Sequence, residues 1–332
     1  MEALRTLYSP KIIAWLLVLI LAIVIPPIVG GYLTSMLILI SIWTIMCFSM
    51  NLIYGYTGQL SLGHAAFLGI GAYAFGLITV KLHVGFWPAF FIAIAITGLL
   101  GFLIGIPALK LRGPHFILVT LGFAVIIGVI VLAWIDLTGG ANGLSGIPRP
   151  NSIPLPWGAK LRFDSLLSMY YFILFFLVLI VLFCHRLVNS LLGKTFIAIS
   201  YNENLTESLG VNTMLKKLLS FTISSMLAGV AGVLYASYNI VISPDVTHFG
   251  RGMDVVAYLI VGGAGTMAGP ITGTLVLMAL PEVLQIMPYL KTLINGVILM
   301  LFIIFLPNGI IGWFNTIPGR LLKTRRVEHG PA

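Results

Sequence analysis

"LTSMLILISIWTIMCFSMNLI", residues 33–53, decides the fold class of this chain. The stretch contains no Asp, Glu, Lys or Arg, and it has about the length of ~20 apolar residues that an α-helix needs to cross a bilayer core. Similar runs recur between Lys11 and Pro307, and the 332-residue chain is 59% hydrophobic and only 8% charged. These values lie outside the range of soluble domains, so the sequence predicts an all-α, polytopic helical membrane protein.

The hydrophobic runs on either side of this stretch predict about ten transmembrane segments. They cover roughly 12–30, 33–53, 65–81, 86–107, 115–134, 168–186, 214–240, 252–265, 268–287 and 290–306. The eighth segment is short and rich in glycine, so nine full spans plus one re-entrant segment is an alternative. We expect a single transmembrane domain over residues 1–332. The first run lacks a small-residue cleavage site, so we interpret it as a retained span rather than a signal peptide.

The positions of lysine and arginine predict the orientation in the membrane. With a cytoplasmic N-terminus, twelve of the 18 basic residues fall on the cytoplasmic side and six on the other side. By the positive-inside rule, this bias places both termini in the cytoplasm. Residues 136–165 then form an external loop, which either docks an extracytoplasmic partner or is a simple connector, and residues 187–213 form a cytoplasmic loop. The basic residues make no stripe interleaved with aromatic side chains, so we expect no nucleic-acid partner.

In this map no acidic or basic residue lies at mid-bilayer depth, because Asp254 and Glu282 fall near outer ends and Asp245 and Arg251 fall in an outer loop. Ion-coupled carriers generally need an intramembrane ionisable group. The chain is therefore expected either to pass solute passively or to take energy from a partner that hydrolyses ATP. The stretch "VNSLLGKT" at 188–195 lacks the first glycine of a phosphate-binding loop. With no metal-ligand cluster or nucleophile–base pair visible, we expect no enzyme activity, cofactor or metal site.

The cytoplasmic loop contains an unusually polar stretch, "GKTFIAISYNENLTESLGVN", residues 193–212. Its segment Asn204–Glu207 has the form of a capping box with Asn204 as the N-cap residue. Gly210 suits the left-handed position that ends a helix. The pattern predicts one or two turns of amphipathic helix over 205–209, preceded by a turn over 195–201. An interfacial helix without specific function has the same pattern.

Two glycine-rich stretches interrupt the hydrophobic runs. Their polar and glycine residues are Gly55, Gly58, Gln59, Ser61, Gly63 and His64 in the first, and Gly262, Gly263 and Gly265 in the second. Broken helices are tolerated at membrane depth where they are buried in protein or line a cavity, so both stretches are candidates for the translocation path. The simpler alternatives are close helix packing for the glycines, a hydrogen bond from His64 to a carbonyl, and a tight cytoplasmic hairpin for the second stretch.

Six blocks of sequence share a pattern with one transporter family. They are "YGYTGQLSLGHAAFLGIGAYAFG" (54–76), "LKLRGPHFILVTLGFA" (109–124), "TGGANGLSGIP" (138–148), "AISYNENLTESLGVN" (198–212), "VGGAGTMAGPITG" (261–273) and "LPNGIIG" (306–312). In this order they resemble the LivM-type permease subunits of branched-chain amino acid ABC importers. ABC permeases for urea or short amides share the pattern, so they are the alternative within this class. An ATP-independent channel or facilitator is the alternative outside it.

The resemblance implies an ABC importer permease fold, in a bacterial inner membrane, that translocates hydrophobic amino acids. It implies a heterodimer with a homologous LivH-type permease, two cytoplasmic ATPase subunits and an extracytoplasmic solute-binding protein. It also implies that the polar stretch is a coupling helix that docks into a groove on the ATPase. The expected contact residues are Glu203, Asn204, Leu205, Glu207, Ser208 and Leu209, with Gly210 required for the turn. Family members commonly carry a basic residue where this chain has Ser200, which removes one expected ion pair.

Overall fold

The computed structural model describes residues 10–154, 160–161, 163–283, 296–297, 300–302, 304–306 and 309–312. Its α-helices are α2 (Pro10–Val24), α3 (Gly31–Met50), α4 (His64–Val80), α5 (Phe86–Ala108), α6 (Pro114–Ala133), α7 (Ile135–Thr138), α8 (Leu166–Asn189), α9 (Leu191–Tyr201), α10 (Glu203–Ser208), α11 (Thr213–Asn239), α12 (Phe249–Gly262) and α13 (Gly269–Val283). A π-helix, η1 (Asn51–Tyr56), extends α3, and η2 (Gly140–Asn142) and η3 (Pro244–Thr247) are 3₁₀ turns. The all-α prediction is confirmed.

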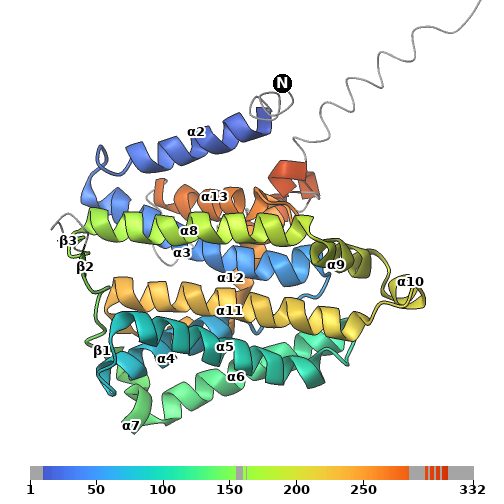
Figure 1. The fold of residues 1–332 in the computed structure, drawn as a ribbon, viewed down its shortest axis with the longest axis horizontal. Helices are drawn as coiled ribbons and strands as arrows, with labels where there is room; N and C mark the ends of the chain where they lie inside the picture. Colours follow the sequence, from blue (N-terminus) through green and yellow to red (C-terminus); the bar gives the residue numbers. More distant parts are fainter. Residues whose placement is uncertain are drawn as a thin grey trace, which may run out of the picture.

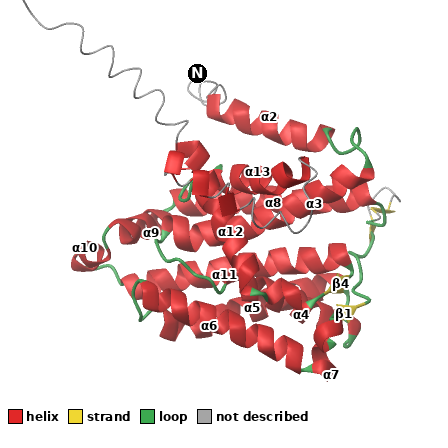
Figure 2. Cartoon of the chain, turned by 180° about the vertical axis from the view of Figure 1, so that it is seen from behind, coloured by secondary structure: helices red, strands yellow, loops and turns green. Residues whose placement is uncertain are grey.

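The strands are two residues long and lie at one end of the molecule. They are β1 (Leu144–Ser145), β2 (Ile153–Pro154), β3 (Lys160–Leu161) and β4 (Val241–Ile242), paired antiparallel as β1 with β4 and β2 with β3. Figure 1 shows the long helices side by side, with the strands at one end and α9 and α10 at the other, and Figure 2 shows the same arrangement from behind. The predicted external loop therefore contains short paired segments, which the sequence pattern did not indicate.

Five helices in the described part of the chain are long and apolar enough to cross a membrane. They cover Gly31–Tyr56, Phe86–Ala108, Pro114–Ala133, Leu166–Asn189 and Thr213–Asn239. Nine of the ten predicted segments are helices, but α4 and α12 have only 17 and 14 residues. Helix α13 has 15 residues within the described range of the chain that stops at Val283. At 1.5 Å per residue, α12 is about 21 Å long, too short for a bilayer core of about 30 Å. The tenth segment, 290–306, lies mostly outside the described residues.

The core forms where α11 packs against α3, α4 and α5, and small residues allow these helices to approach closely. A Cβ atom on Gly71 of α4 would lie 2.6 Å from the Cα atom of Gly229 of α11, and one on Gly101 of α5 would lie 2.3 Å from the hydroxyl of Ser225. Lipid tails are as apolar as leucine, so membrane helices associate through such close packing rather than through the hydrophobic effect. Leu99 on α5 is 58% exposed and Leu182 on α8 is 60% exposed, which fits a lipid-facing exterior.

Helix α12 begins in the middle of the bundle, not at its outer end. The guanidinium carbon of Arg251 lies 5.9 Å from the ring centroid of Trp43, and the Sγ atom of Cys47 lies 4.0 Å from the carbonyl oxygen of Val255. Trp43 is twelve residues from the start and thirteen from the end of the span Gly31–Tyr56. The prediction that Arg251 occupies an outer loop is therefore wrong, since Arg251 belongs to α12 and contacts the middle of the span Gly31–Tyr56. That no charged residue lies at mid-bilayer depth stays a prediction. The chain returns inward through β4 and η3 before α12 begins, and hydropathy does not record such a reversal.

Candidate functional site

The polar stretch between α8 and α11 forms two short helices that begin with well-defined caps. The side-chain oxygen of Ser190 accepts from the amide of Gly193 at 3.4 Å and starts α9. The Asn202 side chain accepts from the amide of Leu205 at 3.0 Å and starts α10. After α10, Gly210 adopts φ +83°, a conformation that glycine reaches without a steric penalty. This confirms the predicted helix end at Gly210.

The predicted capping box is wrong in its position. The N-cap residue is Asn202 rather than Asn204, and residues 195–201 belong to helix α9 rather than to a turn. Because α9 continues to Tyr201, the backbone breaks at Asn202, where φ is −158° and ψ is 100°. The Asn204 side-chain oxygen instead accepts a hydrogen bond from the Arg112 guanidinium at 3.3 Å.

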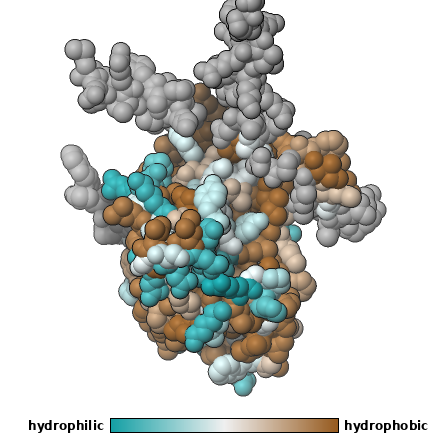
Figure 3. All heavy atoms as spheres, turned by 90° about the vertical axis from the view of Figure 1, so that its right-hand side faces the viewer, coloured by the Kyte–Doolittle hydropathy of each residue, from teal (hydrophilic) through white to brown (hydrophobic). Residues whose placement is uncertain are grey.

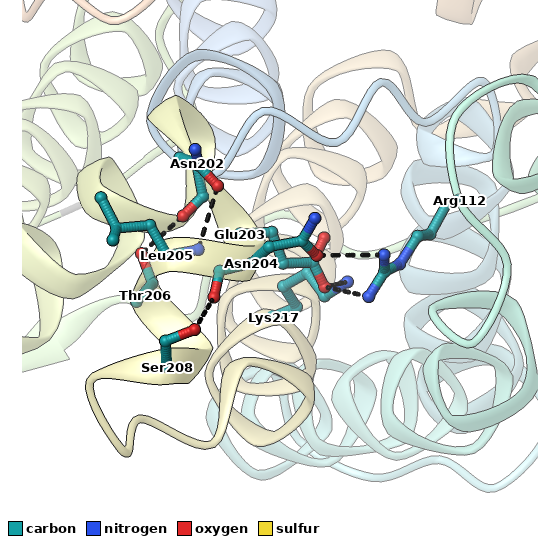
Figure 4. A network of polar contacts seen from close by, with 8 residues as sticks. All are labelled: Arg112, Asn202, Glu203, Asn204, Leu205, Thr206, Ser208 and Lys217. Atoms are coloured by element: carbon teal, nitrogen blue, oxygen red, sulfur yellow. Dashed lines mark hydrogen bonds and ion pairs between the residues drawn. The ribbon is translucent and has the colours of Figure 1, made fainter.

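Glu203 anchors α10 to the rest of the bundle (Figure 4). Its Oε1 atom accepts from the Nζ atom of Lys217 on α11 at 2.6 Å and lies 3.9 Å from the guanidinium of Arg112, in the turn between α5 and α6. The side chain of Lys217 is 3% exposed, that of Glu203 20% and that of Arg112 63%. We call Glu203, Lys217, Arg112 and Asn204 the Glu203 clamp. It joins α10 to two separate parts of the bundle.

The clamp gives Glu203 a role that the sequence analysis missed. A buried ammonium that loses its carboxylate partner is strongly destabilising, so the Glu203 carboxylate is needed within the chain itself. The Glu203 side chain therefore points into the bundle, whereas the sequence analysis expected it to point outward and contact the ATPase. One signal was present in the sequence, since Lys216 and Lys217 lie near the N-terminal end of a helix, where the macrodipole disfavours cations unless they are paired.

The outward side of α9 and α10 carries exposed apolar residues beside polar ones. Tyr201 is 86% exposed, Leu205 59% and Leu209 77%. Asn204, Glu207 and Ser208 are exposed around them. Figure 3 looks onto this end of the molecule and shows hydrophilic and hydrophobic residues close together on it. Such a surface suits contact with another protein or with the membrane interface. Tyr201 was not among the predicted contact residues.

The structure brings together the two glycine-rich stretches that the sequence presents separately. The Asn51 side chain accepts from the amide of Gly265 at 2.9 Å and donates to the carbonyl of Thr266 at 2.8 Å. A Cβ atom on Gly55 would lie 2.4 Å from the Gly265 nitrogen, so this approach requires glycine. The buried Gly262 and Gly263 end α12 just before this junction. Together these contacts join η1 to the turn between α12 and α13.

The first glycine-rich stretch also contacts the polar segment. Gly58 has φ +76°, and a Cβ atom added to it would lie 3.1 Å from the Cβ atom of Ser200 on α9. Gln59 is half-buried and Gly63 is buried against the carbonyl of Thr120. Because Gly58 follows the C-terminal end of η1 by two residues, a movement of α9 would displace the end of the α3–η1 span.

His64 and Ser61 are buried in the core, with exposed fractions of 1% and 0%. The Nε2 atom of His64 lies 2.9 Å from the hydroxyl of Ser224 on α11, so its predicted carbonyl partner is wrong. The His64 Nδ1 atom and the Ser61 hydroxyl are buried without a hydrogen-bond partner in the described part of the chain. Assignment of these residues to a translocation path stays a prediction. Among the described residues, no group of His, Cys, Asp and Glu could hold a metal ion.

Comparison with known proteins identifies the family. Residues 32–306 match the family described as "Branched-chain amino acid transport system / permease component". The chain is 31% identical to the high-affinity branched-chain amino acid transport system permease protein LivM of Escherichia coli K12 over 310 aligned residues. The alignment covers 88% of this chain and 73% of that protein. It is 24% identical over 288 residues to LivH of Salmonella typhimurium, covering 82% and 92% of the two chains.

A third relative comes from a different import system. It is the autoinducer 2 import system permease protein LsrC of Salmonella paratyphi B, 29% identical over 241 residues, or 69% of this chain and 66% of that protein. No solved structure matches the chain. The matched relatives are transport permeases, so the chain is a transport subunit rather than an enzyme. The family match covers most of the sequence, and the chain belongs to the permease-component family of branched-chain amino acid transport systems.

Proposed function

We propose that this ABC importer permease subunit translocates branched-chain amino acids across a bacterial cytoplasmic (inner) membrane, with both termini in the cytoplasm. It pairs with a homologous LivH-type permease, and two ATPase subunits and an extracytoplasmic binding protein complete the complex. The LivM and LivH relatives support this solute because both are named for branched-chain amino acids and cover 88% and 82% of the chain. The alignment with the autoinducer 2 permease covers a smaller share of the chain, 69%.

The α9–α10 segment is the proposed coupling element, and one observation carries this assignment. The Glu203 clamp fixes the inward side of α10 to the bundle, while Tyr201, Leu205 and Leu209 remain exposed on the outward side. A rigid element that is anchored on one side and open on the other can transmit the closing motion of an ATPase pair. Leu205 and Leu209 would enter a groove on the ATPase, with Asn204, Glu207 and Ser208 at its polar edge and Gly210 shaping the exit.

The contact between Gly58 and Ser200 supports a route from this element to the candidate translocation path. Movement of α9 would reach η1 through Gly58 and then the turn after α12 through the Asn51–Gly265 hydrogen bond. Interfaces packed this closely switch between discrete arrangements rather than deform smoothly. We therefore assign Gly55, Gly58 and Gly265 to the moving junction at the inner end of the path.

The test is uptake into vesicles that contain the chain, its partner permease, the ATPases and the binding protein. The variant Leu205→Ala/Leu209→Ala removes two exposed apolar contacts, each worth about 1 kcal/mol at an interface, so ATP-driven leucine uptake should fall about tenfold or more. Leu191→Ala is the matched control, because Leu191 is 82% exposed on α9 but lies at its far end. Equal uptake by the double variant and the control would overturn the coupling assignment.

The same vesicles test the solute and the energy source. Isoleucine and valine should compete with labelled leucine, whereas urea and acetamide should not. Competition by urea would instead identify a permease for urea or short amides. Leucine uptake that proceeds at full rate without ATP would identify a facilitator.

A further inference from the structure

Helix α11 carries a row of buried polar residues that starts at the Glu203 clamp and continues into the core. Lys217, Ser220 and Ser224 are 2%, 0% and 0% exposed. They are spaced three and four residues apart, so they lie on one face of the helix. Figure 1 shows α11 running from α10 along the length of the bundle. This face of α11 therefore leads from the proposed coupling element into the interior of the bundle.

The two serines of this row contact the two sides of the break between η1 and α4, residues 57–63. The hydroxyls of Ser220 and Thr57 lie 2.7 Å apart, and Thr57 directly follows η1. One helical turn further along α11, the Ser224 hydroxyl lies 2.9 Å from the Nε2 atom of His64, the first residue of α4. Thr57 and His64 are also buried, with exposed fractions of 0% and 1%. One helix thus holds the chain on both sides of the break.

Two of these hydroxyls have a second acceptor within their own segment of the chain. The Thr57 hydroxyl donates to the carbonyl of Leu52 at 3.0 Å, and the Ser224 hydroxyl donates to the carbonyl of Phe221 at 3.0 Å. A hydroxyl has one proton, so it can donate either across the interface or to the local carbonyl. The contact between α11 and the break can therefore open without leaving a hydroxyl proton buried and unpaired, which would otherwise oppose the movement.

The other two serines of α11 differ in their partners. Ser225 and Ser237 are also 0% exposed, but their hydroxyls donate to carbonyls one turn back in the same helix, each at 2.8 Å. Such bonds satisfy a buried hydroxyl without joining two helices. Within the described residues, Ser220 and Ser224 are therefore the α11 serines whose hydroxyls connect α11 to side chains of other segments.

We propose that α11 is a lever that sets the separation of the two sides of the break, through a hydroxyl joint formed by the positioning residues Thr57, Ser220, Ser224 and His64. Movement of α10 reaches α11 through the 2.6 Å bond between Glu203 and Lys217, and α11 carries it to the hydroxyl joint as a rigid helix. This route is separate from the contact between Gly58 and α9. The inference rests on the proposed function, since it takes the ATP-driven motion of α10 as its input.

The first experiment measures leucine import and ATP hydrolysis together in vesicles that contain the purified, assembled complex. Ser220→Ala/Ser224→Ala removes both hydrogen bonds from α11 to the break and changes the side-chain volumes little. The number of leucine molecules imported per ATP should fall roughly five- to tenfold, the factor expected for two interhelical hydrogen bonds in a membrane. A purely structural role would instead lower the amount of assembled complex and leave this ratio unchanged.

Ser225→Ala/Ser237→Ala is the matched control, because it removes two buried hydroxyls from the same helix without breaking a bond to another segment. Its import ratio should stay within about twofold of that of the unmodified complex. Equal ratios in the two double variants would refute the hydroxyl joint.

The second experiment asks whether Thr57 and Ser220 act as a pair. Thr57→Val and Ser220→Ala each remove one hydroxyl of the same bond, so the import ratio of the combined variant should equal that of the worse single variant. Thr57→Ser keeps the hydroxyl and should keep the unmodified ratio. Multiplied losses in the combined variant, or a loss in Thr57→Ser as large as in Thr57→Val, would overturn the pairing.

Import by the unmodified complex separates the two possible failures. If that complex imports leucine with ATP but Ser220→Ala/Ser224→Ala keeps the same import ratio, the hydroxyl joint alone is wrong. If it does not import leucine at all, the proposed function has failed.

Discussion

Removing the Glu203 carboxylate should loosen α10 by a predictable amount. In Glu203→Gln, the Lys217 ammonium, whose side chain is 3% exposed, loses the carboxylate that lies 2.6 Å away. Breaking a fully buried pair costs about 3–5 kcal/mol, and the 20% exposure of Glu203 lets water replace part of the interaction. We therefore expect a loss of about 2–3 kcal/mol in the free energy that holds α10 in place.

Hydrogen exchange at α10 measures this loss directly. The amides of Leu205 and Thr206 are bonded to the side chain and the carbonyl of Asn202, so they exchange only when α10 opens. A loss of 2–3 kcal/mol raises the open population, and hence the exchange rate, roughly 30- to 150-fold. Glu207→Gln is the matched control, because Glu207 is exposed and makes no ion pair within the described residues.

A second variant separates charge from packing. In Glu203→Gln/Lys217→Met the unpaired buried charge is gone, and replacing a buried ion pair by apolar groups is often neutral. Most of the protection at Leu205 and Thr206 should return. The reasoning is refuted if Glu203→Gln exchanges within about twofold of Glu207→Gln, since that is below the ~0.5 kcal/mol typical of surface substitutions.

Three further predictions concern single residues. Asn202→Ala should destabilise α10 by about 1 kcal/mol and raise its amide exchange about fivefold, whereas Asn204→Ala should do less, since only Asn202 caps the helix. Gly210→Ala places a side chain at φ +83°, which destabilises the native turn by about 1–2 kcal/mol. The rate of ATP-driven leucine uptake, divided by the amount of assembled complex, should fall. Asn51→Leu breaks both hydrogen bonds to residues 265 and 266, so the free energy of unfolding should fall by about 2–4 kcal/mol. The measurement is a lower melting temperature of the purified complex.

The membrane character and the positions of the helix breaks could be predicted from the sequence. The run 33–53 lies within the span Gly31–Tyr56, and the stretch from Gly55 to Gly63 separates this span from α4. Both are local properties, since about 20 apolar residues suffice to form a span and repeated glycines disfavour a continuous helix. The left-handed backbone conformation at Gly210 could also be predicted locally, because glycine adopts a positive φ without a steric penalty.

The candidate site was only partly predictable. The polar stretch was located correctly, but its helix begins after Asn202, because α9 continues as far as Tyr201. The choice between two asparagines two residues apart depends on where the preceding helix ends, and that depends on the packing of Phe196 and Ile199 into the core. Local sequence did not contain this information.

The sequence by itself determined that this chain is a helical membrane transporter subunit, where most of its helices lie and where they break. The tertiary structure alone decided that Glu203 points inward to Lys217, that the two glycine stretches meet at Asn51, and that Arg251 lies beside Trp43, midway along the span Gly31–Tyr56. The physical reason is that hydropathy and glycine content act over a few neighbouring residues. Depth in the bundle and the pairing of distant side chains arise only when the helices pack, because a short half-helix and a surface loop have similar local composition.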